Sequence, residues 1–575
     1  MWVYNGVRLL RDEGIPRNPR SIILYKQLGW IFFSKMGETM DEMHMVYKQR
    51  WARQMQELLA APPYDKAGEV SAVSAGGAAV LTSPAHALSA GEYVTLAGFG
   101  TTPDINGSQS VSSVVDANHF TIAVDVTRVT DGAGTWTRDA TDAFRPIAEA
   151  PLDKDTQPDR DHVIQAAQRD KLLRDADVAA YAALLAAQGV KIDEGLLIAY
   201  NAYTRSDDVE VTRVVPPRPE TEKDQAMSRL INAPQHALAR NRLLAFIRAQ
   251  ILWNHYRMDP QWMLGMMDRY GPIDWRVVDA HGLYWLTYGM HVCESLSRDD
   301  IDAINLDRII LNCLKSMTWN GRMTYVENPT NPDAPYIRMF SDWRFIDATQ
   351  AEHDRLIQAI IKTRKQEYKE NILKDGHINY LASAIQMLYA GHRRQKAQEL
   401  YDWVKKHYDL KVFEWKLPLD DFVFWRLNTD GKPIPEIAFN QMTAALQMAF
   451  FFLSRNEMDA YRDSFNYARR VYTKYMEDSP DRLKMPPFAI MVANVAADML
   501  VMPRSVGFNL PLESRIRLYA SLDPDIQVLL YDPVRPFLAR ECRSYGLDFR
   551  EAFPPPPGLR EYRDGQRQQF TPLAP

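Results

Sequence analysis

The densest group of residues that could do chemistry lies at 253–291, where aromatic and acidic side chains alternate along the chain. A cleft that cleaves glycans needs tryptophan and tyrosine faces beside two carboxyl groups, one acting as acid and the other as base. The candidate carboxylates are Asp259, Asp268, Asp274 and Asp279. The same residue types also serve as helix caps and packing anchors in helical proteins, and we favour that interpretation.

The tripeptide Asp-Trp-Arg occurs twice, at 274–276 and 342–344. In a structural interpretation, each copy supplies a capping aspartate, a buried tryptophan and an arginine paired with a carboxylate. In a functional interpretation, both copies line one groove that holds the acidic or C-terminal group of a partner protein. The candidate groove residues are Asp274, Trp275, Arg276, His281, Trp285, Asp342, Trp343 and Arg344.

The sequence gives only weak indications of a metal site or of a catalytic motif. His291 with Glu294, and Asp41 with His44, each place two metal-ligand types on one helix face, but two ligands do not make a site. Nucleophile elbows, Walker loops, H-E-x-x-H and dinucleotide-binding glycine patterns are absent from the sequence. We therefore expect no metal, no cofactor and no enzymatic activity.

Composition excludes several classes of protein. The 575 residues are 46% hydrophobic and 25% charged, with a formal charge of -5, so neither disorder nor a general affinity for nucleic acid is expected. The uncharged stretches 70–91 and 437–454 are interrupted by glycine, proline or amide residues, so we expect no membrane span. Only three cysteines occur, which fits a reducing compartment and makes the cytoplasm the default location.

Hydrophobic periodicity predicts a chain made mostly of helices, interrupted by one β-rich segment. Residues 69–138 are rich in glycine, valine and threonine, with Asn-Gly and Asp-Gly turns between short alternating runs. The predicted organisation is a helical hairpin at 1–62, a β insert at 69–138, a loop-like linker at 139–160, a helical domain at 161–550 with a β-hairpin near 322–340, and a Pro-rich tail at 551–575 with little fixed structure.

The helical pairs resemble tetratricopeptide repeats, in which small and bulky residues recur on two antiparallel helices. The residues that carry this resemblance are Tyr25, Leu28, Gly29, Phe32, Met43 and Tyr47, then Tyr380, Ala384, Met387, Gly391, Ala397, Tyr401 and Val404, with a weaker copy at 445–468. The resemblance implies an α/α superhelix of stacked hairpins, because one pair cannot bury its apolar face alone.

Two further resemblances concern longer stretches. The strings NPRSIILYKQLGWIFFSKMG, YGPIDWRVVDAHGLYW and SDWRFIDAT are similar to a family of large bacterial helical proteins without a known activity. Its fuller members carry an N-terminal extension with a membrane anchor, which implies that this chain lacks its beginning. The β insert resembles the first catalytic cysteine half-domain of ubiquitin-activating enzymes through His86, Gly91, Val94, Asn106, Gly107, Val114 and Phe120. It implies no ubiquitin chemistry, because no cysteine precedes Cys293.

The leading hypothesis is a non-catalytic scaffold for protein–protein interaction, mainly α, with a tetratricopeptide-like array and one inserted β domain. The first alternative is a glycan-active α/α-toroid enzyme that uses paired carboxylates within 259–279. The second is an envelope-associated structural protein tethered through the β insert. The partner is not identified by the sequence.

Overall fold

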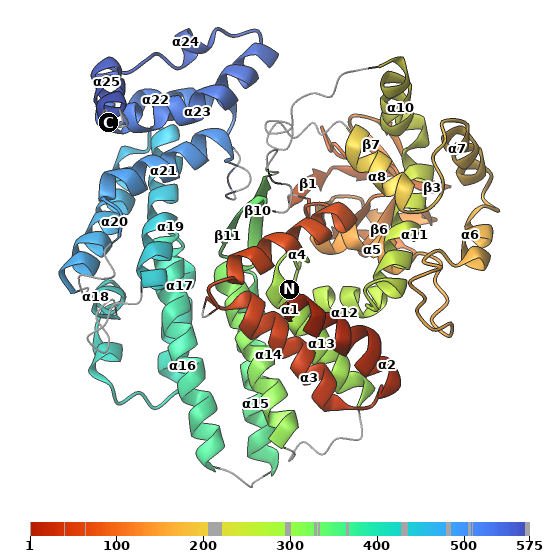
Figure 1. Cartoon of the computed structure of the whole chain (residues 1–575), viewed down its shortest axis with the longest axis horizontal. Helices are drawn as coiled ribbons and strands as arrows, with labels where there is room; N and C mark the ends of the chain where they lie inside the picture. Colours follow the sequence, from red (N-terminus) through yellow and green to blue (C-terminus); the bar gives the residue numbers. More distant parts are fainter. Residues whose placement is uncertain are drawn as a thin grey trace, which may run out of the picture. The chain divides into compact units, whose positions relative to one another are not determined.

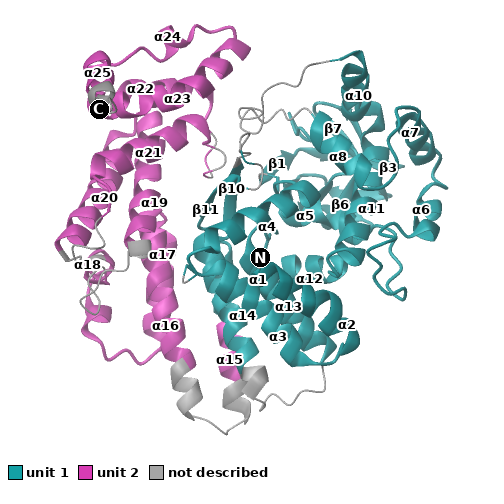
Figure 2. Ribbon diagram, viewed as in Figure 1, with its two compact units in different colours: residues 1–207, 215–352 teal, residues 208–214, 353–575 magenta. Residues whose placement is uncertain are grey.

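Figure 1 shows the computed structural model of the chain, which describes residues 2–39, 41–63, 65–204, 221–293, 301–326, 334–363, 367–426, 435–478, 485–503 and 510–569, together with Asn331, Val506 and Phe508. The chain divides into two compact units, residues 1–207 with 215–352 (unit 1) and residues 208–214 with 353–575 (unit 2), coloured separately in Figure 2. It is predominantly helical with a separate antiparallel β module, which confirms this part of the prediction. Within the described ranges, every helix is too short or too polar to cross a membrane.

The β module is a nearly closed antiparallel sheet in unit 1. Its strands are β1 (Lys66–Val70), β2 (Ala72–Val73), β3 (Ala78–Thr82), β4 (Tyr93–Ala97), β5 (Gly100–Thr102), β6 (Gly107–Asp116), β7 (His119–Asp125), β8 (Arg128–Asp131) and β9 (Gly134–Arg138). Seven of them pair in the order β1-β9-β4-β6-β7-β3-β2, and β5 pairs with β8. The first and last strands are neighbours, so both ends of the insert leave at one place.

The alternation expected for half-buried strands fills the interior of this sheet. On β7, Phe120 and Ile122 are fully buried while their chain neighbours are not. Trp136 of β9 closes the core and donates its Nε1–H to Ser83 Oγ at 2.9 Å. The module therefore has a hydrophobic core of its own, as an inserted domain requires.

The segment 139–160, predicted to be a loop-like linker, begins with helix α5 (Ala140–Ala148). Asp139 and Asp142 form a reciprocal capping box that starts this helix directly after β9. Pro146 lies inside the helix. Because proline usually breaks helices, the sequence pattern predicted a loop here. Phe144 and Ile147 are buried, so α5 joins the insert to the helical core rather than spacing the two apart.

The core of unit 1 includes helix α13 (Val278–Val292), which is buried over most of its length. Before the insert the helices of unit 1 are α1 (Trp2–Arg8), α2 (Ile15–Arg17), α3 (Ile22–Trp30) and α4 (His44–Leu59), with π-helical turns η1 (Leu9–Gly14) and η2 (Ile31–Gly37). After it come α6 (Ala166–Leu172), α7 (Ala176–Ala187), α8 (Glu194–Tyr203), α10 (Glu222–Asn232), α11 (Ala237–Asn254), α12 (Pro260–Tyr270) and α14 (Ile301–Asn320). The predicted hairpin is confirmed as β10 (Arg322–Val326) paired with β11 (Tyr336–Phe340), and α15 (Phe345–Thr363) follows.

Helices α3 and α13 approach so closely that glycines are required where they cross. A Cβ atom at Gly289 of α13 would lie 2.4 Å from Tyr25 Cβ, and one at Gly29 of α3 would lie 2.6 Å from Leu286 Cγ. Neither neighbour is the free end of a flexible chain, so the helices would have to separate. Of the first predicted repeat, Tyr25, Leu28 and Phe32 are buried, against α13, whereas Met43 is half exposed before α4.

Unit 2 is built from helical hairpins. The described elements are α16 (Glu367–Ala390), α17 (Arg394–His407), η4 (Phe413–Lys416), α18 (Leu419–Trp425), α19 (Pro435–Ser454), α20 (Met458–Asp478), α21 (Phe488–Val501), α22 (Leu512–Ser521), α23 (Pro524–Ser544), α24 (Phe549–Ala552) and α25 (Leu559–Gln569). Helices α16 and α17 pack as one pair, and α19 and α20 as another. In the first pair, the predicted core residues Tyr380, Ala384, Met387, Ala397, Tyr401 and Val404 are all buried.

The segment 551–575 was predicted to have little fixed structure, and for its described part this is wrong. Phe553 is fully buried against Tyr519 and Phe549. Tyr519 also donates its hydroxyl to the Pro554 carbonyl at 2.7 Å. The prolines end α24 and turn the chain back, and α25 follows. A run of prolines in the sequence does not reveal that Phe553 beside it is an anchoring core residue, or that Pro556 is buried.

The close approach of α3 and α13 predicts that alanine substitution at the crossing and at an open glycine will change the free energy of unfolding in opposite directions. Gly289→Ala should lower the free energy of unfolding by about 1–3 kcal/mol, because its methyl group overlaps Tyr25. Gly265→Ala, in α12, is the matched control, since no atom lies within 4 Å of its Cβ position. It should raise that free energy by about 0.5–1 kcal/mol through helix propensity. Urea unfolding of both variants measures this, and equal effects would contradict the close approach.

Candidate functional site

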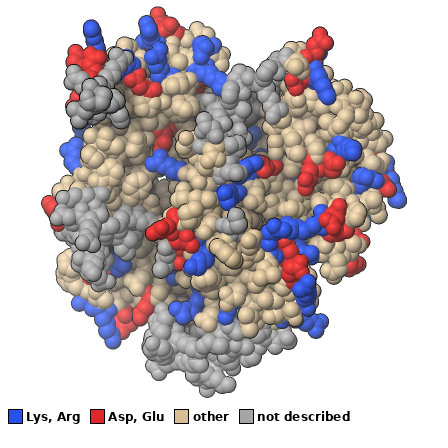
Figure 3. All heavy atoms as spheres, in the orientation of Figure 1, with Lys and Arg blue, Asp and Glu red and all other residues tan. Residues whose placement is uncertain are grey.

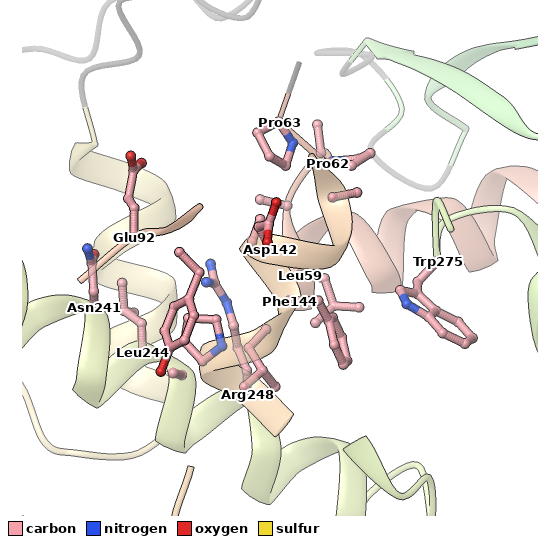
Figure 4. Close-up of a pocket in the computed structure, with 18 of the residues that line it drawn as sticks. Leu59, Pro62, Pro63, Glu92, Asp142, Phe144, Asn241, Leu244, Arg248 and Trp275 are labelled. Carbon is pink, nitrogen blue, oxygen red and sulfur yellow. The ribbon is translucent and has the colours of Figure 1, made fainter. Parts of the chain in front are cut away.

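A cavity of about 300 Å³ lies in unit 1, where the β module meets the helices. Figure 4 shows its wall, which α11 supplies through Asn241, Leu244 and Arg248. The end of α4 and Pro62-Pro63, the start of β4, the end of β9, α5 and the turn before α13 complete it. The lining mixes polar and charged groups with apolar side chains, which include Leu59, Phe144, Ile147, Met267 and Trp275. A hollow that combines apolar side chains with a few placed polar groups is a usual form of ligand site.

Arg248 is the most unusual polar residue of this wall. Its Nε–H donates to the Leu58 carbonyl at 2.9 Å, and its guanidinium carbon lies 6.0 Å from the ring centroid of Tyr200. Within the described ranges, no carboxylate forms an ion pair with it, and burial lowers its pKa. An arginine nevertheless stays charged. Arg248 is partly buried, and the C-terminal end of α4 offsets about half a charge, so the cation is only partly compensated.

The other charged side chains of the cavity have ion-pair or hydrogen-bond partners within the protein. Arg138 contacts Glu92 at 3.1 Å, which neutralises both. Asp142 accepts hydrogen bonds from Thr95 Oγ1 at 3.0 Å and from the Asp139 amide at 3.2 Å. Burial raises the pKa of Asp142. The cavity therefore presents one cation without a counter-charge beside groups that are already satisfied.

The first Asp-Trp-Arg motif forms an edge of this cavity, and its charges are consumed internally. Arg276 Nε and Nη2 donate to the two oxygens of Asp274 at 2.9 and 2.8 Å. The same guanidinium donates to the Met323 carbonyl at 2.7 Å and to Gln56 Oε1 at 2.8 Å. Asp274 and Arg276 are both buried, so the motif ties the turn before α13 to β10 and α4.

The second motif repeats this geometry elsewhere. Arg344 Nε and Nη2 donate to Asp342 at 2.9 and 2.6 Å, and Nη1 contacts Asp65 at 3.1 Å. Asp342 is buried, and the pKa of its carboxyl group is lowered by Arg344 and Arg322, which outweigh the effect of burial. Asp342, Trp343 and Arg344 do not line the cavity, so the two motifs are not walls of this one site.

The remaining two groove candidates lie inside the core. His281 and Trp285 of α13 are almost completely buried. His281 Nε2 contacts the Trp275 carbonyl at 2.7 Å, and its ring packs against Phe32 and Trp51. These side chains hold α13 in place and offer no surface to a partner.

The four candidate carboxylates are dispersed over separate roles. Asp259 caps α12 by accepting from the Gln261 amide and pairs with Lys154 at 2.8 Å. Asp268 pairs with Arg145 at 3.2 Å on the surface, and Asp279 is buried in α13. Of the four, only Asp274 reaches the cavity, where Arg276 holds it. The four carboxylates therefore do not form an acid–base pair that faces one cavity.

The candidate metal pairs gain no third ligand in the part of the chain that the structure describes. Asp41 accepts from the Met43 amide, and His44 Nδ1 contacts Lys48 Nζ at 3.3 Å. Glu294 lies outside the described residues.

Arg248 and Asn241 were not among the site residues predicted from the sequence. The signal for Arg248 was present, because it is the one charged residue in the apolar run 243–252. A cation among buried residues of a helix is unusual, because removing a charge from water is costly unless another group pairs with it. The other walls of the cavity come from segments that are far apart in the chain, so spacing could not group them.

Comparisons with known proteins give no relative: no family model matches the chain, and neither the curated proteins nor the solved structures contain a match.

Two buried groups of α13 predict opposing effects of pH on stability. Burial raises the pKa of Asp279 to about 6 and lowers that of His281 to about 3. From pH 4 to 6 the folded state holds a proton on Asp279 that the unfolded state has lost, so stability falls as pH rises. From pH 3 to 6.5 the unfolded state holds a proton on His281 that the folded state cannot, so stability rises with pH.

His281→Gln should remove the second effect, which is on the order of 4 kcal/mol across its range. The free energy of unfolding should then decrease from pH 4 to 6, whereas Asp279→Asn should give a steeper rise over the same interval. Urea titrations at half-unit pH steps measure both slopes. An unchanged slope in both variants would show that these groups titrate normally.

Proposed function

We propose that this protein is a non-catalytic binding scaffold whose unit 1 cavity holds an acidic group of a partner protein. One observation carries the proposal: Arg248 is a partly buried cation that lines the cavity without a carboxylate partner among the described residues. A carboxylate that enters the cavity completes the pair and forms charge-assisted hydrogen bonds with the guanidinium. In the groove interpretation of the Asp-Trp-Arg motifs the cations would be Arg276 and Arg344, but both are paired with their own aspartates.

The size and lining of the cavity favour a chain end with an apolar side chain. About 300 Å³ is at the small end of ligand sites and suits one or two residues. Leu59, Phe144 and Trp275 supply apolar contact, while Arg248 supplies the charge. A C-terminal residue of a protein combines these two features, because its carboxylate adjoins its side chain.

The surroundings argue against a site for extended polyanions or for glycan cleavage. Lysine and arginine are interspersed with aspartate and glutamate over the face in Figure 3. The carboxylates that a glycan-active enzyme needs cap helices, form ion pairs or lie in the core. These roles support binding over catalysis.

A tetratricopeptide-like array belongs to the same proposal. The pairs α16–α17 and α19–α20 are successive helical hairpins with short turns and buried small residues at Ala384, Ala445 and Ala468. Stacked pairs of this kind present extended surfaces for partner chains. In unit 1 the β module supplies Glu92 and Arg138 to the cavity wall, which gives the insert a direct part in the proposed site.

The test compares short peptides that end in leucine or phenylalanine, each with a free or an amidated C-terminus. The free acids should bind at least tenfold more tightly, which corresponds to about 1.4 kcal/mol. Arg248→Met should abolish this difference, because it keeps an unbranched apolar stem in place of the arginine stem and removes the guanidinium charge. Arg242→Met, on the same helix, is the matched control, since Arg242 pairs with Asp175 outside the cavity.

Fluorescence anisotropy of labelled peptides measures the affinity of the free-acid and the amidated peptides for the wild-type protein and for each variant. Equal binding of acid and amide by the wild-type protein would refute the role of Arg248. Release of reducing sugar from a polysaccharide panel, lost in Asp274→Asn, would refute the non-catalytic assignment.

A further inference from the structure

An exposed apolar face covers the outer side of the N-terminal helices of unit 1. Four large apolar side chains remain accessible there: Trp2 is 89% exposed, Leu9 64%, Ile23 50% and Trp30 38%. Single exposed apolar residues are common on protein surfaces, whereas a contiguous group of them marks an interaction site. None of the four lines the Arg248 cavity.

These side chains belong to two helical segments that pack side by side. A Cβ atom at Gly6 of α1 would lie 3.6 Å from Ile31 Cδ1, and one at Gly14 of η1 would lie 3.6 Å from Leu24 Cδ1. The segment α1–η1 therefore runs antiparallel to the segment α3–η2. Leu24 and Ile31 are half-buried along the seam between them, so the apolar surface continues from one segment to the other.

The spacing of the exposed residues is the same on both segments. Trp2 and Leu9 are seven positions apart, as are Ile23 and Trp30. Seven residues correspond to about two helical turns, so each pair lies along one side of its segment. The opposite side of each segment is packed into the core, as Leu28 shows. A helix that is apolar on opposite sides is normally covered on both.

The charge around this face is positive. Residues 18–37 contain no acidic residue and carry Arg20, Lys26 and Lys35. Arg20 and Lys35 are exposed, and within the described ranges neither forms an ion pair. Lys35 Nζ lies 5.7 Å from the ring centroid of Trp30, which places this charge directly beside the apolar surface.

The acidic residues of the neighbouring segment do not cancel this charge. Asp12 is only 10% exposed and is held by Arg11 and Arg160. Glu13 pairs with Arg17 at 2.6 Å. The α3–η2 side of the face therefore combines exposed apolar side chains with positive charge.

We propose that this face binds an amphipathic α-helix of a partner protein whose apolar stripe is flanked by acidic residues. In stacked arrays of helical hairpins, the hairpin at the end has a polar outer face, whereas an inner hairpin presents apolar residues to its neighbour. The outer face here is of the second kind. The apolar stripe of the partner helix covers the four exposed side chains, and its acidic flank lies beside Arg20 and Lys35.

Two other occupants agree less well with these observations. A second copy that docked through the same face would bring Arg20, Lys26 and Lys35 against themselves, because a twofold interface pairs a surface with itself. An anionic bilayer accepts tryptophan and basic residues, but it does not require apolar residues at two-turn spacing on both segments. A helix with acidic flanks accounts for the charge and the spacing together.

The probe is a displayed library of helices about five turns long, which share one leucine stripe and vary among glutamate, glutamine and lysine on both flanks. Selection on the wild-type protein should enrich glutamate at the flanks. High salt should weaken the binding of the enriched helices, because it screens their charges. Enrichment of no clone, or of clones with lysine at the flanks, would overturn the proposal.

The double variant Leu9→Ser, Ile23→Ser removes apolar contact without changing the core. Both side chains are at least half exposed, so the variant should melt at the wild-type temperature while it binds the enriched helices at least tenfold more weakly. Ile198→Ser is the matched control, because Ile198 is 68% exposed on α8 and lies outside this face. It should bind the helices as wild type does.

The double variant Arg20→Gln, Lys35→Gln tests the charge separately. It should retain binding through the leucine stripe and lose the preference for glutamate over lysine at the flanks. An unchanged preference would show that these two residues do not select the partner.

Sedimentation velocity and vesicle binding identify the other occupants. A wild-type dimer that the Leu9→Ser, Ile23→Ser variant cannot form would assign the face to a second copy. Cosedimentation with phosphatidylglycerol vesicles, lost in the same variant, would assign it to a membrane. Either result would overturn the helix proposal. Arg248→Met should bind the enriched helices as wild type does, so the two sites are tested separately.

Discussion

The crossing of α3 and α13 is the contact on which the rest of unit 1 depends. Glycines at 29 and 289 let the two backbones approach until Leu286 and Tyr25 fill the space that a side chain would take. This approach buries α13 along nearly its whole length, including Asp279, His281 and Trp285. With α13 fixed, the turn that precedes it is fixed too, and Trp275 and Arg276 reach the cavity from that turn. A close-packed interior transmits such a constraint because it cannot yield locally.

Charge is distributed unevenly in this interior. Both Asp-Trp-Arg motifs neutralise themselves with two parallel hydrogen bonds between arginine and aspartate, and Arg138 is held by Glu92. Arg248 is different, since no carboxylate among the described residues forms an ion pair with it. The unfolded chain solvates such a charge freely, so its burial destabilises the folded state unless a ligand pairs with it. The proposed function follows from this imbalance.

The β module and its helical host meet through α5, which the capping box of Asp139 and Asp142 starts directly after the last strand. Strands β1 and β9 are neighbours, so the insert enters and leaves at one edge and keeps its own core. The cavity forms at this junction because β4, β9, α5 and α11 converge there without filling the space completely. An insert placed in this way adds a wall to a site and leaves the packing of the host intact.

The sequence by itself determined the class of the fold: helical periodicity, the change of composition near residue 69 and the buried pattern of α16 and α17 come from local chain properties. It also predicted that each Asp-Trp-Arg motif holds an arginine paired with a carboxylate, which the contacts of Arg276 and Arg344 with their own aspartates provide, whereas the predicted cap is absent at α13, whose N-cap residue is Val277. Local pattern failed at α5 and at Phe553, where a proline masks the helix and a distant aromatic cluster supplies the anchor. Only the tertiary structure decided the sites. Arg276 is paired by Asp274, two residues away, whereas the absence of a carboxylate near Arg248 depends on which remote segments pack against α11, because electrostatic pairing acts through space rather than along the chain.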